Sequence, residues 1–200
     1  MSLPDGVLGE SVAVSYEVWL TNRGGNSGTW NRVFSFCYYF ENNDNYKSIS
    51  LLQYDGTSKL GITTLGAGEY IGWISEVEFN NLTRAHVVLL VISKESEPLL
   101  YVNGKREMLI KCPLGSNYSD PNALIDSGKQ NWIGKSLGNN QGFVGSVHEL
   151  RIWSGILTEQ EIISHYNAHV LAALQELQDL QGKVNALNIS ARAEANQLAG

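Results

Sequence analysis

The chain has 200 residues, with 20 acidic and 14 basic side chains and a net charge of −6 at pH 7. This length suits one domain of ordinary size with an appendage. The acidic balance and the absence of any basic cluster argue against nucleic-acid binding, which depends largely on Lys and Arg at phosphates. No run of about 18 apolar residues occurs, so the sequence predicts no membrane insertion.

Apolar and polar residues alternate with a period of two over most of the chain, which is typical of β-strands. Residues 85–93 are instead almost entirely apolar, which predicts a strand covered on both faces. Glycine-rich or asparagine-rich turns separate the segments, and no helical period intervenes. The other predicted strands before the last one are residues 11–21, 32–40, 46–54, 60–65, 69–75 and 130–134.

Asn103-Gly104 is the strongest hairpin signal, because Asn-Gly favours the tight turns that join antiparallel strands. It lies between residues 99–102 and 108–110, so the sequence predicts that these two segments pair.

Residues 141–153 form the last predicted strand. Strict alternation places Val147, Glu149 and Arg151 on one face, and His148, Leu150 and Ile152 on the other. Ser154-Gly155 ends the strand. Thr158 and Glu161 then form a capping box that opens a helix.

Within that helix, residues 163–191 repeat apolar positions in alternating steps of three and four, a heptad seam. A helix running to Leu198 would be about 60 Å long. Two alternatives are open: the seam joins a second copy or docks on a neighbouring domain, or the chain becomes a frayed linker beyond Gly182.

The order of these segments resembles a laminin G-like domain of the concanavalin A-like lectin/glucanase group. The resemblance rests on Phe143-x-Gly145 with Glu149, on residues 100–105 at the hairpin and on residues 132–134, and it covers residues 4–167. It implies an all-β fold: an antiparallel β-sandwich (concanavalin A-like jelly roll) over residues 4–157. A long C-terminal α-helix then occupies residues 158–200, as a coiled coil or connector.

Members of this family usually have a further strand before the position of Leu3-Pro4. We therefore expect either a trimmed edge or a branch without that strand, and a replacement partner at the sheet edge.

The resemblance implies a non-catalytic recognition or adhesion module that binds a glycan or protein ligand through rim loops. Such a module would belong to a larger extracellular or cell-surface protein. The alternative is a scaffolding domain without a small ligand, in which the helix mediates oligomerisation or domain docking.

Polar loop clusters and aromatic residues supply the candidate ligand contacts: Asn42, Asp44, Trp73, Asn139 and Asn140. Laminin G-like domains often hold calcium at the sandwich rim, and calcium prefers several oxygen ligands. Asp126 resembles one calcium position of the family, and Glu69 is the only substitute at the second.

Polysaccharide-cleaving relatives of this fold carry closely spaced carboxylates on one strand. Glu76-Val-Glu78 is the nearest match, and we interpret it as a solvated strand face. The sequence therefore predicts no enzyme. Cys37 and Cys112 could be free buried thiols or a disulfide.

Overall fold

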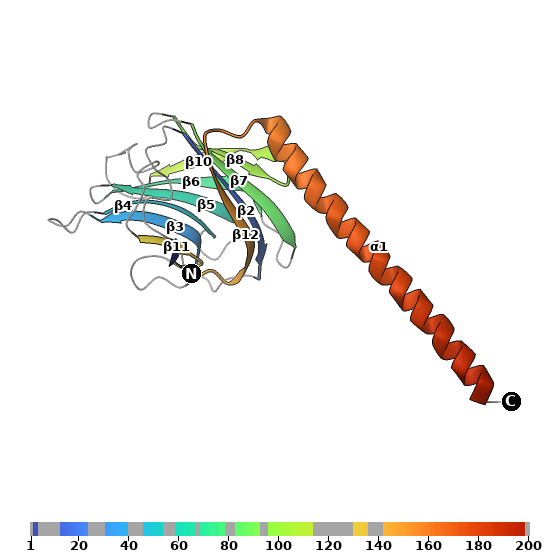
Figure 1. The fold of residues 1–200 in the computed structure, drawn as a ribbon. Helices are drawn as coiled ribbons and strands as arrows, with labels where there is room; N and C mark the ends of the chain where they lie inside the picture. The colour runs from blue at the N-terminus through green and yellow to red at the C-terminus, as the bar shows by residue number, and fades with distance from the viewer. Residues whose placement is uncertain are drawn as a thin grey trace. The chain divides into compact units, whose positions relative to one another are not determined.

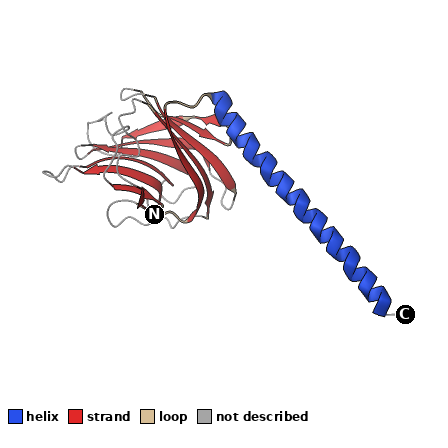
Figure 2. Ribbon diagram, in the orientation of Figure 1, coloured by secondary structure: helices blue, strands red, loops and turns tan. Residues whose placement is uncertain are grey.

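A computed structural model describes residues 2–3, 13–23, 31–39, 46–53, 59–66, 69–78, 83–92, 96–113, 130–135 and 142–198. These residues form two antiparallel sheets and one long helix (Figures 1 and 2). The predicted fold, an antiparallel β-sandwich followed by a C-terminal helix, is confirmed.

The larger sheet has seven strands. In spatial order they are β1 (Ser2–Leu3), β11 (Gln130–Ile133), β3 (Asn31–Tyr39), β4 (Tyr46–Gln53), β5 (Lys59–Gly66), β6 (Glu69–Glu78) and β10 (Leu109–Pro113). The smaller sheet has five: β12 (Gly145–Ser154), β2 (Val14–Asn22), β7 (Arg84–Val91), β8 (Leu99–Val102) and β9 (Lys105–Glu107).

The core lies between the sheets and is centred on an aromatic cluster. The ring of Tyr16 on β2 stacks on Phe34 and Phe36 of β3, with centroids 5.2 and 5.3 Å apart. Every second residue of a strand points to the same face, so β2 sends Val14, Tyr16, Val18 and Leu20 into this core. Burial raises the pKa of the Tyr16 hydroxyl, because the charged form would lose its hydration.

Strand β7 is the middle strand of the smaller sheet, and its residues 85–91 are all buried. Both faces are therefore covered, as its continuous apolar sequence predicted.

The Asn103-Gly104 turn is present, with left-handed backbone at both residues (φ 53° and 76°). The predicted second arm of the hairpin is wrong, because β8 pairs with β9 at residues 105–107. After Met108 the chain crosses to the other sheet as β10 and pairs with β6. One short run thus supplies an edge strand to each sheet.

The predicted alternation along the last strand is also wrong. A β-bulge leaves His148 as an extra residue, so that Val147 lies opposite Leu20 and Glu149 opposite Trp19. Val147, Leu150 and Ile152 consequently all pack against the core. Just before the bulge, a Cβ on Gly145 would collide with the carbonyl oxygen of Thr21, which explains the glycine of the Phe-x-Gly motif.

Strand order decides the question of the two cysteines. Cys37 lies on β3 and Cys112 on β10, and three strands separate these two. Four strand spacings amount to about 19 Å. A disulfide needs Cα atoms within about 7 Å, so the two cysteines do not form a bridge within one chain.

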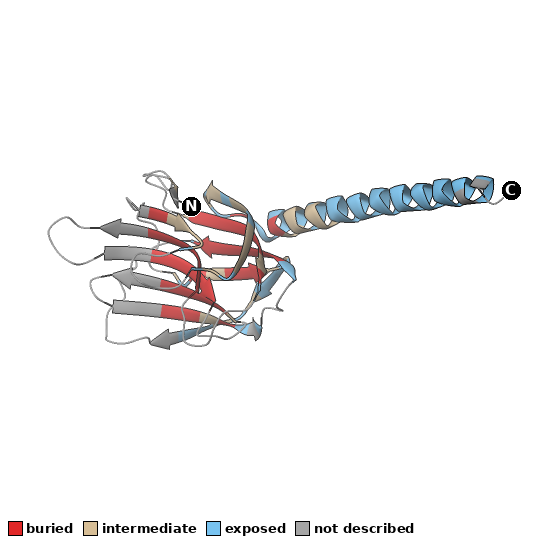
Figure 3. Cartoon of the chain, turned by 90° about the horizontal axis from the view of Figure 1, so that it is seen from below, coloured by how far each residue is buried: buried red, intermediate tan, exposed pale blue. Residues whose placement is uncertain are grey.

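The helix α1 (Glu159–Leu198) is continuous for 40 residues and passes through Gly182, so the frayed-linker alternative is wrong. Ile162 is fully buried, whereas every helix residue from Leu171 on whose burial is described is exposed (Figure 3). Among the described residues, no helix is both long enough and apolar enough to span a membrane. The chain divides into two compact units, residues 1–159 and 160–200.

Candidate functional site

Polar residues gather on the face of the smaller sheet that points away from the core. Ser15, Glu17 and Trp19 alternate with the core residues of β2, so they share this outer face. All three are nevertheless buried, with Glu17 only 1% exposed. A carboxylate buried to this extent needs hydrogen-bond donors around it.

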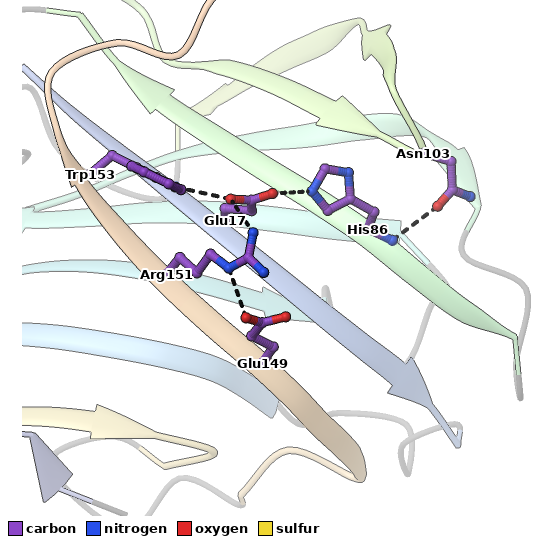
Figure 4. Close-up of polar contacts among 6 residues, drawn as sticks. All are labelled: Glu17, His86, Asn103, Glu149, Arg151 and Trp153. Carbon is purple, nitrogen blue, oxygen red and sulfur yellow. Dashed lines mark hydrogen bonds and ion pairs between the residues drawn. The ribbon is translucent and has the colours of Figure 1, made fainter. Parts of the chain in front are cut away.

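Two neighbouring strands provide these donors (Figure 4). The indole Nε1 of Trp153 on β12 donates to Glu17 Oε2 over 2.9 Å. The imidazole Nε2 of His86 on β7 lies 2.8 Å from Glu17 Oε1. The Arg151 guanidinium lies 3.8 Å from the same carboxylate and also donates to Glu149 Oε1 over 2.7 Å. Glu17 therefore links β12, β2 and β7, three neighbouring strands of the smaller sheet.

His86 is held from two further sides. Its ring stacks on Trp19 with centroids 4.6 Å apart, and its backbone N–H donates to Asn103 Oδ1 over 2.9 Å. The Asn103 N–H in turn donates to the His86 carbonyl over 2.7 Å. The polar network thus extends from the edge strand β12 to the turn between β8 and β9.

The chemistry of the Glu17–His86 pair follows from its burial. Both side chains are at most 1% exposed, so a substrate has no access to either in this arrangement. The nearby Ser15 hydroxyl already donates to the Gly155 carbonyl and accepts from the Leu157 N–H. The network therefore joins strands and fixes the path of the chain after β12.

A second group of polar residues crosses the larger sheet as a row that is buried except at its Trp132 end. Cross-strand register places one residue from each of five neighbouring strands in a single row: Trp132, Ser35, Ser50, Thr63 and Gly72. Opposed residues share a face. Because Phe34, Phe36 and Ile49 beside them face the core, this row lies on the face away from it.

Hydrogen bonds organise the middle of this row. The hydroxyls of Ser35 and Ser50 are 2.8 Å apart, and Arg32 Nε donates to Ser50 Oγ over 3.3 Å. Both serines and Arg32 are buried. Trp132 at the β11 end is partly exposed, with the Lys135 ammonium 4.7 Å from its ring centroid. Its buried indole N–H has no hydrogen-bond partner among the described residues. The row thus ends in an aromatic and cationic pair that solvent reaches.

Most of the residues predicted from sequence to contact ligand lie outside the described residues: Asn42, Asp44, Asn139, Asn140 and the calcium candidate Asp126. Glu69 begins β6, but its side chain is likewise outside the description. Trp73 requires a correction. It is 6% exposed and belongs to the core, so its ring offers no face to a sugar.

Metal binding was predicted at Asp126 and Glu69. Within the described part of the chain, no group of three or more His, Cys, Asp or Glu side chains could hold a metal ion. Neither predicted ligand has a described side chain. Calcium at the rim therefore stays a prediction from the sequence.

A groove of about 410 Å³ lies where the chain passes from β9 to β10, lined by Glu97, Pro98, Leu99, Arg106, Glu107, Met108 and Leu109. Desolvation raises the pKa of the Glu107 carboxyl, and the Lys105 charge partly opposes this. Met108 is 66% exposed at the rim. The groove joins an apolar wall to charged side chains.

Sequence reasoning missed Glu17, His86 and the serine row. The available signal was a single acidic or basic residue within each of the largely apolar strands 14–20 and 85–91. An ionisable residue in such a strand needs a partner when buried. The partner is the part that sequence spacing does not reveal.

Residues 1–163 match the family model described as the concanavalin A-like lectin/glucanases superfamily. The sandwich is therefore of the concanavalin A-like class, as the resemblance implied. Within that class the chain belongs to the laminin G family named Laminin_G_3. A comparison with curated protein sequences finds no match.

Several solved structures share this fold. The Ruminococcus gnavus IT-sialidase CBM40 bound to α2,3-sialyllactose is 11% identical, with a TM-score of 0.59 over 83% of this chain and 95% of that one. The heptameric SAP-like pentraxin of Limulus polyphemus is 16% identical, with a TM-score of 0.52 over 82% and 71%. The NanB sialidase of Streptococcus pneumoniae is 15% identical over 82% of this chain but only 26% of its own. At these identities the likeness concerns the fold.

Proposed function

We propose that this chain is a non-catalytic recognition module that binds a glycan or a protein ligand, as part of an extracellular or cell-surface protein. The observation that carries the proposal is the partly exposed Trp132 with the exposed Lys135 ammonium beside its ring, at the one accessible end of the polar row on the larger sheet. One protein of the same fold supplies a precedent, because the Ruminococcus gnavus CBM40 is bound to sialyllactose.

The chemistry of the row suits a hydroxyl-rich ligand. The partly exposed Trp132 ring presents an apolar surface to the C–H groups of a sugar, while the nearby Lys135 ammonium donates to oxygen atoms. Ser35, Ser50 and Arg32 are joined by hydrogen bonds and are all buried, so they support the row rather than contact the ligand.

The non-catalytic part of the proposal rests on the acidic side chains. The fully described Glu17–His86 pair is closed to substrate. Glu76 and Glu78 are both exposed on β6, consistent with a solvated strand face. Hydrolysis by two carboxylates requires a confined pair about 5–10 Å apart around the scissile bond.

A glycan array followed by calorimetry tests the proposal. The wild-type chain should bind at least one sialylated or neutral glycan, and Trp132→Ala and Lys135→Ala should weaken binding by about tenfold or more. Lys105→Ala is the matched control, because Lys105 is also exposed but lies on the other sheet. Equal binding by all variants would contradict the proposed site. The complete absence of a glycan ligand would favour a protein ligand, for which the same variants serve.

A second candidate function is a scaffolding domain in which α1 makes the assembly. The exposed apolar residues of α1 favour it, because they need a partner that the described residues do not supply. Binding by the sandwich separates the two candidates, since a pure spacer would bind neither glycan nor protein through Trp132.

A further inference from the structure

The helix α1 carries large apolar side chains that water reaches. Leu177 is 62% exposed, Leu180 51%, Val184 49% and Leu187 69%. These four follow one another in steps of three and four, so they form one stripe along the helix. We name the stripe from Val170 to Ala191 the seam.

An uncovered seam conflicts with the length of the helix. Isolated helices are only marginally stable in water, and most helices depend on packing of their apolar face. From Leu171 on, all helix residues with described burial are exposed, yet α1 is continuous to Leu198. A partner for the seam accounts for both observations.

We infer that this partner is a second copy of the chain, paired with the first as a parallel, in-register two-stranded coiled coil. In heptad terms the a positions hold Val170, Leu177, Val184 and Ala191. The d positions hold Ala173, Leu180 and Leu187. Two of the four a residues are β-branched and two of the three d residues are leucine, the combination that favours two parallel strands over higher oligomers.

The residues flanking the seam permit this pairing. In a parallel pair each g position faces the e position five residues later in the partner helix. Glu176 then faces Gln181 and Lys183 faces Asn188, so no two like charges meet. The amide of Gln181 can donate to a carboxylate, and that of Asn188 can accept from an ammonium. The flanks are thus complementary to a second copy of themselves.

The area of the seam agrees with a modest interface. A fully covered aliphatic side chain removes about 60–100 Å² from water. Seven seam positions on each of two helices then give about 800–1,400 Å², near the lower end of stable interfaces at about 1,200–2,000 Å². We therefore expect a reversible dimer that dissociates on dilution.

A parallel pair has a functional consequence that rests on the proposed recognition function. Both sandwiches would begin at the same end of the coil, so two binding sites would act together on a surface rich in ligand. Two linked sites can raise the apparent affinity by about a hundredfold or more without a new contact.

Sedimentation equilibrium of the full chain over a wide concentration range tests the dimer. The wild type should pass from one to two chain masses. Leu177→Gln with Leu187→Gln should weaken the dimer by about tenfold or more, because both lie in the seam. The matched control is Leu171→Gln with Ile189→Gln, whose residues are exposed to the same degree, 66% and 70%, but lie off the seam. A monomeric wild type, or equal loss in both double variants, would overturn the inference.

Orientation and bivalence need separate measurements. Ala191→Cys should give a disulfide-linked dimer under oxidation, because equal a positions meet only in a parallel, in-register pair. The wild type controls for Cys37 and Cys112, and no added crosslinking would overturn the parallel arrangement. On a dense ligand surface, the Leu177→Gln, Leu187→Gln variant should dissociate faster while its single-site affinity is unchanged. A wild-type chain that binds ligand but stays monomeric refutes only this inference, whereas a wild-type dimer without any ligand refutes only the recognition function.

Discussion

At the scale of single residues, Glu17 illustrates how a buried charge is tied to its neighbours. Removing a carboxylate from water is costly, and here the donors of Trp153 and His86 offset that cost. Removing one member of this network and forming the intact network change the stability by different amounts. Taking away one member leaves the others buried with unmet hydrogen bonds, which costs more than the intact pair contributes.

The first prediction compares two glutamates that both contact Arg151. Glu17→Ala should lower the free energy of unfolding by about 2–4 kcal/mol, because it removes the carboxylate that accepts from the partly buried Trp153 and the buried His86 side chains. Glu149→Ala should lower it by less than about 1 kcal/mol, because Glu149 is 39% exposed and water replaces the ion pair. Urea denaturation followed by tryptophan fluorescence measures both. Similar losses in the two variants would mean that burial does not control the strength of this network.

The candidate site was the part of the molecule least accessible to sequence reasoning at this scale. Glu17 and His86 are 69 positions apart, and spacing gives no hint that strand register places them side by side. The same holds for Ser35, Ser50 and Trp132, which come from three strands. Trp73 could have been a surface or a core residue, and only the packing decides it.

At the scale of elements, the fold was largely predictable because each strand carries its own signal. Alternation located β2, and continuous apolar sequence located β7 with both faces covered. Two local errors share one cause. The extra residue His148 and the crossing at Met108 are set by pairing with distant strands, and alternation contains no information on pairing.

The second prediction concerns the glycine within α1. Gly182 lies on the outer side of the seam, and a Cβ added there meets no atom within 4 Å. Glycine costs a helix interior about 0.5–1 kcal/mol relative to alanine. Gly182→Ala should therefore stabilise α1 by about that amount, measured by the helical circular dichroism signal during heating. An unchanged helix transition would indicate that residues 170–198 gain their stability wholly from elsewhere.

At the scale of the whole molecule, the two units differ in what holds them. Residues 1–159 have a core between two sheets, whereas most of residues 160–200 expose their side chains. All five tryptophans precede residue 158, so their fluorescence reports on the sandwich alone. The helical signal at 222 nm reports chiefly on α1, because α1 is the long helix of the described residues.

The third prediction uses this separation of signals. Removal of residues 171–200 should leave the sandwich transition, followed by fluorescence, within about 0.5 kcal/mol of the wild type, because no side chain described there is buried. Leu100→Ala is the contrasting variant. Leu100 lies in the core between the two sheets and is 0% exposed, so its truncation should cost about 2–5 kcal/mol. A large loss on removing the exposed residues would mean that the two units are not independent.

The hydrogen bonds that the Ser15 hydroxyl makes to residues 155–157 affect how the domain responds to a pulling force. Any tension transmitted along α1 enters the sandwich through residues 155–157, just beyond the edge strand β12. There the Ser15 hydroxyl bonds the Gly155 carbonyl and the Leu157 N–H, and the Gly155 N–H bonds the Ala13 carbonyl. These three bonds take the load before the pairing of β12 with β2 does. Under a pulling force we expect these three hydrogen bonds to break first, before the longer set of backbone hydrogen bonds between β12 and β2.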